Sequence, residues 1–247
     1  MLIPKKNLII NDLHIPFQDK VAVELVLDFT AKKKPHRVII DGDGIDFYEL
    51  SRFDKNPNRK TNLQWEIDEM RGFLIRLRNI LPKAEIVYIE GNHEARLRKY
   101  LWRKGAEIAS LRCLDFKELL GLKSLNINYY EEGYWLGKLY IYHGTLIRKD
   151  SGATAKAEFM KNGCSGISGH CHRDGKFGVR NQGGLFGWWE NGCLCDLNPE
   201  YIEGIANWVQ GFTMVTQVKG KEFVWPIAII NGTCAFGGHI YKLKELK

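Results

Sequence analysis

The chain has 247 residues, of which 45% are hydrophobic and 26% charged. This composition excludes a disordered or fibrous chain and fits one large globular domain, which we expect to span residues 1–247. The formal net charge of +7 favours an anionic partner, although a solvated helix face accounts equally well for the basic run at 96–104. Because no apolar stretch is long enough to cross a bilayer and no signal-peptide core is evident, we expect a cytoplasmic protein without membrane contact.

The first half of the chain alternates between two hydrophobic periods. Amphipathic helices are predicted over 19–34 and 62–81, where apolar residues recur at helical spacing. Short runs rich in Ile, Val, Leu and Tyr predict five strands, at 7–11, 37–41, 85–90, 138–143 and 164–168. The resulting strand–helix–strand–helix–strand order predicts an α/β fold whose first three strands are parallel.

The remaining segments give weaker signals. We expect a helical insertion around 94–122, a helix over 156–162 that follows a flexible SGAT at 151–154, and a β-hairpin over 212–230 that turns at KGKE. The glycine- and aromatic-rich segment 180–199 fits either a lid or substrate platform or a twisted strand pair with buried tryptophans. We favour the strand pair, because most aromatic side chains serve packing. Residues 173–199 are kept as the candidate lid or substrate segment.

Polar residues that are hard to place in a core follow all five strand runs. They are Asp12 and His14 in NDLHIPF, Asp41, Asp43 and Asp46 in DGDGIDF, Asn92 and His93 in EGNHEAR, His143 in YHGT, and His170 and His172 in GHCH. Functional groups in α/β proteins gather beyond the carboxyl ends of strands, so we expect these side chains on one surface of the sheet. Such a density of carboxylates and imidazoles is unfavourable unless a cation binds there. A mixed nitrogen and oxygen set suits Zn, Mn or Fe better than Ca or Mg.

The order of these blocks from residue 12 to residue 172 resembles that of the calcineurin-like metallophosphoesterases. This resemblance implies two mixed β-sheets packed as a sandwich and flanked by helices, in four α/β/β/α layers. It also implies a binuclear centre for two divalent or trivalent transition-metal ions, with Mn, Fe or Zn expected and Ni or Co compatible. One ion would be held by Asp12, His14, Asp43 and His172, and the other by Asp43, Asn92, His143 and His170.

The same resemblance implies hydrolysis of a phosphomonoester or phosphodiester by attack of a metal-bridging hydroxide. His93 would contact the phosphoryl group and protonate the leaving oxygen, and Asp46 would orient His93. Arg96 and Arg148 are candidates for binding the substrate phosphate, because a guanidinium presents a planar fork to oxyanions. Glu94 is expected to cap or charge the start of the following helix.

Three functional alternatives remain open from the sequence. Besides the phosphoesterase, the chain could be a catalytically silent metal-bound scaffold or interaction module, since fold does not guarantee activity. A mononuclear zinc hydrolase would leave several ligands unused. The excess of basic over acidic residues favours a nucleotide or nucleic-acid substrate over a phosphoprotein. The natural substrate, the metal and the oligomeric state are not fixed by the sequence.

Overall fold

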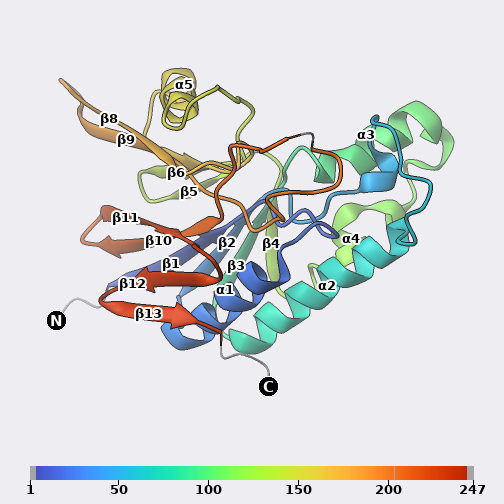
Figure 1. Ribbon diagram of the computed structural model, residues 1–247, viewed down its shortest axis with the longest axis horizontal. Helices are drawn as coiled ribbons and strands as arrows, with labels where there is room; N and C mark the ends of the chain where they lie inside the picture. Colours follow the sequence, from blue (N-terminus) through green and yellow to red (C-terminus); the bar gives the residue numbers. More distant parts are fainter. Residues whose placement is uncertain (1–3, 203, 244–247) are drawn as a thin grey trace.

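The computed structural model describes residues 4–202 and 204–243, and Figure 1 shows two β-sheets stacked face to face with helices outside them. The predicted domain of 1–247 includes residues 1–3, 203 and 244–247, which lie outside the described residues. Within the described ranges, no helix has both the length and the apolar character that crossing a membrane requires.

The first sheet has six strands in the order β11-β10-β1-β2-β3-β4. Their bounds are β1 Lys5–Ile10, β2 Arg37–Asp41, β3 Glu85–Ile89, β4 Ile127–Tyr130, β10 Gly211–Val218 and β11 Lys221–Ala228. Strands β1 to β4 are parallel to one another, whereas β10 pairs antiparallel with β1 and with β11. The predictions of three parallel opening strands and of a C-terminal hairpin turning at 219–222 are therefore confirmed.

The second sheet has five strands in the order β5-β6-β7-β9-β8. They are β5 Tyr134–Leu136, β6 Leu139–Ile141, β7 Gly166–Ser168, β8 Gly175–Asn181 and β9 Gly184–Glu190. Strands β6, β7 and β9 are parallel, and β5 and β8 pair antiparallel at the two edges. A separate hairpin joins β12 Thr233–Phe236 to β13 His239–Lys242.

Alternation of side chains along the buried strands creates the layers. In β1, Ile9 faces the second sheet, whereas Leu8 and Ile10 face α1 (Lys20–Lys33) and α2 (Leu63–Ile80). Successive strand residues point to opposite faces, so one apolar run supplies two cores. On the outer face of the second sheet, α5 (Ala153–Asn162) packs over the fully buried Trp188. The predicted four-layer α/β/β/α sandwich is confirmed.

The expected helical stretch at 94–122 is broken. Its ordered helices are α3, Glu94–Lys104, and α4, Phe116–Leu120, with short 3₁₀ turns at Ala106–Ile108 and Arg112–Leu114. Helix α3 ends at Gly105, and α4 begins where the Asp115 side chain accepts a hydrogen bond from the Lys117 amide. Gly105 and the N-cap residue Asp115 therefore divide a stretch that composition alone predicted to be mostly helical.

Two other expectations need revision. The SGAT segment is not a flexible lead-in, because α5 already begins at Ala153 and Glu190 accepts hydrogen bonds from the amides of Gly152 and Ala155 at 2.9 and 2.7 Å. Segment 175–190 forms the β8–β9 hairpin, with Trp188 at 0% exposure, as the strand-pair interpretation expects. A lid or substrate role for 173–199 stays a prediction.

Candidate metal centre

The predicted site residues gather where the carboxyl ends of strands from both sheets meet. Strands β1, β2 and β3 contribute the loops with Asp12, Asp43 and Asn92, and the loops after β6 and β7 contribute His143 and the GHCH histidines. We expected one surface of one sheet, and this is wrong in detail. The first sheet supplies all of the carboxylates, and the second sheet supplies three of the imidazoles from the opposite side.

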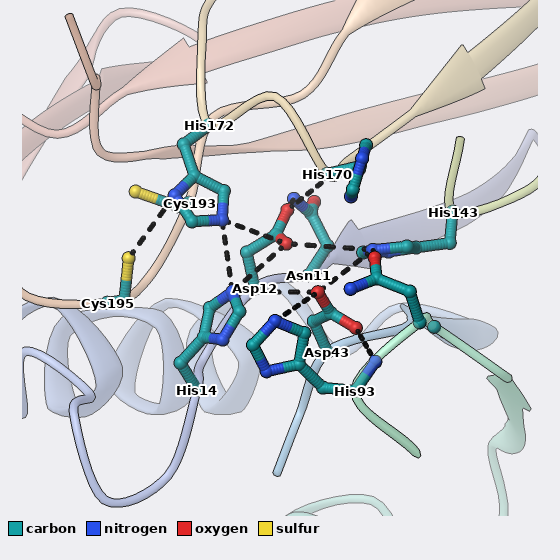
Figure 2. A network of polar contacts seen from close by, with 12 residues as sticks. Asn11, Asp12, His14, Asp43, His93, His143, His170, His172, Cys193 and Cys195 are labelled. Atoms are coloured by element: carbon teal, nitrogen blue, oxygen red, sulfur yellow. Dashed lines mark hydrogen bonds and ion pairs between the residues drawn. The ribbon is translucent and has the colours of Figure 1, made fainter. Parts of the chain in front are cut away.

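The Asp43 carboxylate lies at the middle of this cluster. Its Oδ2 atom is 3.1 Å from the Nε2 atom of His143 and 3.7 Å from the Nε2 atoms of both His14 and His93. Its Oδ1 atom accepts a hydrogen bond of 2.9 Å from the His93 amide at the start of α3. One carboxylate therefore faces histidines from three different loops, as Figure 2 shows.

Asp12 forms a second, adjacent focus. Its Oδ1 atom lies 3.2 Å from His172 Nε2, 3.5 Å from His14 Nε2 and 4.0 Å from His143 Nε2. This oxygen is buried, yet among the described residues no donor is aligned to it. The Nε2 atoms of His14 and His172 also face each other at 3.0 Å. This convergence of ligand atoms fits a transition-metal ion, because imidazole and carboxylate are its ordinary ligands.

The backbone is strained at five of the seven candidate ligands. Their φ angles are positive, at 51° for Asp12, 50° for His14, 49° for Asp43, 64° for His170 and 56° for His172. Residues other than glycine pay for this left-handed conformation, and such residues cluster at functional sites. Five candidate ligands in one cluster therefore share an unfavourable backbone conformation, as expected of a functional site.

Asn92 and His170 complete the predicted ligand set. The Asn92 Oδ1 atom lies 3.2 Å from His143 Nε2. Ligand atoms of Asp43, His143 and His170 all lie within 4.8 Å of one another. The structure thus brings all seven predicted ligands into one cluster.

His93 and Asp46 contact each other as the family pattern implies. The Asp46 Oδ2 atom is 3.1 Å from His93 Nδ1 and also 3.1 Å from His14 Nδ1. Arg96 Nη1 donates to the other oxygen of Asp46 at 2.9 Å, and Arg96 Nη2 lies 2.9 Å from His93 Nε2. Arg96 is therefore at the site but partly engaged by Asp46.

Arg148 occupies a different position. It lies on the exposed loop that follows His143, and its guanidinium donates to the Ile147 carbonyl at 3.2 Å. Arg173 was not singled out from the sequence, although it directly follows GHCH. Its guanidinium donates to the Arg148 carbonyl and thereby ties this loop to the GHCH loop.

The ionisable groups at the centre shift one another's pKa values. Burial alone would raise the pKa of Asp43, but the charges of His143 and His93 hold it well below its usual range. Burial disfavours the charged form of His14, yet hydrogen bonds with Asp12 and Asp46 raise its pKa to about 10. Burial and the nearby charge of His143 lower the pKa of His170 to about 4. Asp43 thus stays ionised and attracts cations, and His170 stays neutral with a lone pair available.

Glu94 does more than the helix-terminal role expected from the sequence. It is the first residue of α3, but its buried carboxylate accepts hydrogen bonds from the amides of Asp43, Gly44 and Gly91 at 2.8–2.9 Å and from the Tyr88 hydroxyl at 2.7 Å. Burial raises the pKa of this carboxyl. It ties the loops after β2 and β3 together beneath Asp43. No local sequence pattern predicts this role for Glu94.

A buried amide network behind Asp12 was also missed. Asn11 Nδ2 donates to the Asp12 carboxylate, and Asn191 Nδ2 donates in turn to Asn11 Oδ1. Thr213 Oγ1 on β10 donates to Asn191 Oδ1 at 2.7 Å. Because Asn191 directly follows β9, the network joins the two sheets at the edge that carries the candidate metal ligands.

Fold and site together define a class: a four-layer sandwich with a mixed carboxylate and imidazole centre where its two sheets meet. The profile of the calcineurin-like phosphoesterases matches residues 6–239. The chain belongs to this family, which is metal-dependent and acts on phosphate esters.

Individual relatives cover nearly the whole chain. The Gene 54 proteins of Mycobacterium phages L5 and D29 are each 27% identical over 256 residues, covering 97% of this chain and 99% of theirs. Among solved structures, Vacuolar Protein Sorting 29 from Cryptosporidium parvum aligns with a TM-score of 0.51 at 13% identity, covering 97% of this chain and 99% of its own. The structural likeness supports the fold.

We expect Glu94→Ala to destabilise the protein and weaken metal binding together. The substitution leaves several buried donors without an acceptor, and each such group costs about 1–3 kcal/mol. Urea unfolding and calorimetric Mn²⁺ titration would measure the two effects. Glu107→Ala, at an exposed glutamate shortly after the same helix, serves as the control. Unchanged Mn²⁺ affinity in Glu94→Ala would contradict a positioning role for this carboxylate.

Glu66 should make the stability depend on pH. Burial, with a further contribution from Asp46, raises its pKa from 4.5 to about 8. Between these two values the folded state holds a proton that the unfolded state has lost, so the free energy of unfolding falls as pH rises, by at most about 1.4 kcal/mol per pH unit.

Urea unfolding of the wild type and Glu66→Gln across pH 4.5–8 tests this expectation. The difference between their stabilities should change over that range and level off above it. Glu69→Gln, at an exposed position on the same helix, should run parallel to the wild type. Parallel curves for Glu66→Gln as well would show that Glu66 titrates normally.

Proposed function

We propose that this chain hydrolyses a phosphate ester at a centre of two transition-metal ions. The position of the Asp43 carboxylate, with its Oδ2 atom facing three imidazole nitrogens at 3.1–3.7 Å, is the observation that supports this most directly. In the proposal, Asp43 is shared by both ions. Asp12, His14 and His172 complete one set of ligands, and Asn92, His143 and His170 complete the other.

The bound ions would polarise the phosphoryl oxygens and lower the pKa of the attacking water. Mn, Fe and Zn are the proposed ions, and Ni and Co suit the same donors. The chain's own residues contribute the orientation of the ligands. Asp46 Oδ2 lies against Nδ1 of His14, and the Asp41 carbonyl lies 2.7 Å from Nδ1 of His143, which leaves Nε2 of each ring turned toward the carboxylates.

His93 is the proposed proton donor to the leaving oxygen. Its Nδ1 atom lies 3.1 Å from Asp46 and its Nε2 atom points toward Asp43, so the ring is held with one nitrogen at the reaction centre. Hydrogen bonds with His14 and His93 keep the pKa of Asp46 well below its usual range although burial opposes this. The contact between Asp46 and Nδ1 of His93 orients the ring for this role. Arg96, which is next to His93, is proposed to contact the phosphate.

The proposed substrate is a nucleotide or nucleic acid. Besides the net charge of +7, Arg173 follows His172 directly and holds the loop that carries the exposed Arg148. The Trp208 ring lies 4.3 Å from the His172 ring and offers an aromatic surface next to the centre. Cations that contact phosphates and aromatic rings that stack on bases are what single-stranded nucleic acid requires. The six free thiols suit a reducing compartment, and we propose the cytoplasm.

Asp43→Ala and His170→Ala should each lower Mn²⁺-dependent hydrolysis of p-nitrophenyl phosphate or of bis-p-nitrophenyl phosphate on the order of 10³-fold or more, because ligands that act as a unit are not individually dispensable. Metal content, measured by mass spectrometry, should fall in parallel. His239→Ala serves as the control, because His239 is exposed and belongs to none of the ligand blocks. Undiminished hydrolysis in Asp43→Ala would refute the assigned centre, and bound metal without turnover in the wild type would favour the scaffold.

A screen of phosphomonoesters, cyclic nucleotides, and single- and double-stranded nucleic acids, each with several metals, tests the substrate class. We expect the nucleic acids to be cleaved, and their binding to weaken steeply as salt rises, because phosphate contacts release counterions. Arg148→Ala and Arg173→Ala should reduce this salt dependence, and Lys242→Ala, on the remote β13, should not. Binding that is indifferent to salt would argue for a small or weakly charged substrate.

A further inference from the structure

Two cysteine side chains lie directly behind His172, on the side away from the carboxylates. Cys193 and Cys195 belong to the segment that returns to the site after β9, and both have 0% exposure. The Cys195 Sγ atom lies 3.8 Å from His172 Nδ1. Ligand atoms of the two cysteines and His172 all lie within 4.8 Å of one another, and Figure 2 shows both sulfur atoms beside this ring.

The C-x-C spacing explains why both thiols face the same way. The backbone of Cys193 forms an isolated β-bridge with Gln210, and the backbone of Cys195 forms one with Gln18. The segment between the two cysteines is therefore extended. Alternate residues of an extended segment point to the same side. Leu194, between the two, points the opposite way into the core beneath the first sheet. The two sulfurs are therefore presented together toward His172.

Backbone hydrogen bonds fix this presentation on both sides. The Cys193 amide donates to the Val209 carbonyl at 2.9 Å, and the Val209 amide donates to the His172 carbonyl at 2.8 Å. On the other side the Leu194 amide donates to the Asp12 carbonyl at 3.1 Å. The thiols and the imidazole are thus joined through short, direct links, and the three donor atoms do not depend on a mobile segment for their approach.

We propose that Cys193, Cys195 and His172 Nδ1 form a separate binding site for one thiophilic metal ion, such as Zn²⁺ or Cd²⁺. Two thiolates and one imidazole are the preferred donors of such ions. Two negative thiolates balance the charge of a divalent ion, which a buried position requires. This inference goes beyond the proposed hydrolysis and does not depend on it.

Binding would proceed with a defined proton balance. Each thiol releases one proton to solvent and donates a sulfur lone pair to the ion, and no electron transfer is involved. Neutral imidazole carries one proton, so coordination through Nδ1 places that proton on Nε2. Asp12 Oδ1 is the carboxylate oxygen next to that nitrogen, at 3.2 Å. His172 is then lost to the carboxylate centre, and the thiophilic ion competes with one of the two ions proposed there.

A cavity lies next to the segment that carries the two thiols. This cavity of about 610 Å³ is lined by Asp196, which follows Cys195, and by Trp208, Val209 and Gln210. Gln210 Nε2 donates to the Cys195 carbonyl at 3.1 Å, so the floor of this cavity and the thiol segment are in direct contact.

Cd²⁺ is a suitable probe, because cadmium bound to thiolates absorbs in the ultraviolet. Titrating Cd²⁺ into the purified full chain, preloaded with saturating Mn²⁺, should produce this absorption at one equivalent, and equilibrium dialysis should show one Mn²⁺ released. In Cys193→Ser/Cys195→Ser the absorption should disappear and Cd²⁺ affinity should fall at least about 100-fold, the upper end of the loss when a mere supporting group of a metal site is removed.

Cys234→Ser, which removes a buried thiol on β12, should retain the absorption and serves as the control. If the double variant does not fold, as judged by circular dichroism, the single variants Cys193→Ser and Cys195→Ser should each weaken Cd²⁺ binding. Cadmium–thiolate absorption that persists in the double variant, or that is absent from the wild type, would overturn the proposal. Retention of both Mn²⁺ ions after Cd²⁺ has bound would overturn the shared use of His172. None of these readouts requires hydrolysis, so failure of this site and failure of the proposed function are separately visible.

Discussion

The Asp43 carboxylate is held at the seam between the two sheets, and the other polar groups of the site are arranged around it. Its backbone is in the left-handed region, its amide donates to Glu94 and its Oδ1 atom accepts from the His93 amide. These three constraints direct Oδ2 toward imidazoles that come from different loops. A carboxylate in this position attracts cations, because ionised oxygens surrounded by nitrogen lone pairs are stable in a buried place only when positive charge accompanies them.

The two sheets need each other at this edge. The first sheet supplies the carboxylates, and the second supplies His143, His170 and His172, so neither sheet alone contains a complete ligand set. The apolar layer between them, which includes Ile9, Ile39 and Ile167, sets their separation. The Asn11–Asn191–Thr213 network repeats this connection with hydrogen bonds directly behind Asp12. Core packing thereby fixes the distance between ligands that lie up to 160 residues apart.

Three of the proposed ligand imidazoles face the carboxylates through Nε2, and they differ in the group that contacts their Nδ1 atoms. His14 has the Asp46 carboxylate, His143 has the Asp41 carbonyl and His172 has the Cys195 sulfur. A carboxylate makes an imidazole a stronger donor than a carbonyl does, and a thiol is a weak partner. Of these three rings, His172 therefore has the weakest hydrogen-bond partner, which is consistent with the second use proposed for its Nδ1 atom. Asp46 serves two rings at once and links ligand orientation to the proposed proton donor.

The sequence by itself determined the buried strands, the two long helices and the polar residues that follow the strands, from which the family resemblance selects the seven candidate ligands. The spacing of hydrophobic residues is a local property that the sequence shows directly. The ligand blocks can be recognised because carboxylates and imidazoles that follow buried strands are unfavourable unless they bind something. The short strands β4 and β5, the β12–β13 hairpin and the break within 94–122 were not predicted. Strands of three or four residues carry little periodic signal, and β6 and β7 were found because histidine-containing blocks follow them. A helix end depends on one cap. Only the tertiary structure decided that two sheets share the site, that Glu94 supports Asp43, and that Cys193 and Cys195 stand behind His172. Those contacts join residues far apart in sequence, and their geometry follows from sheet packing and strained loop backbones, which no local pattern records.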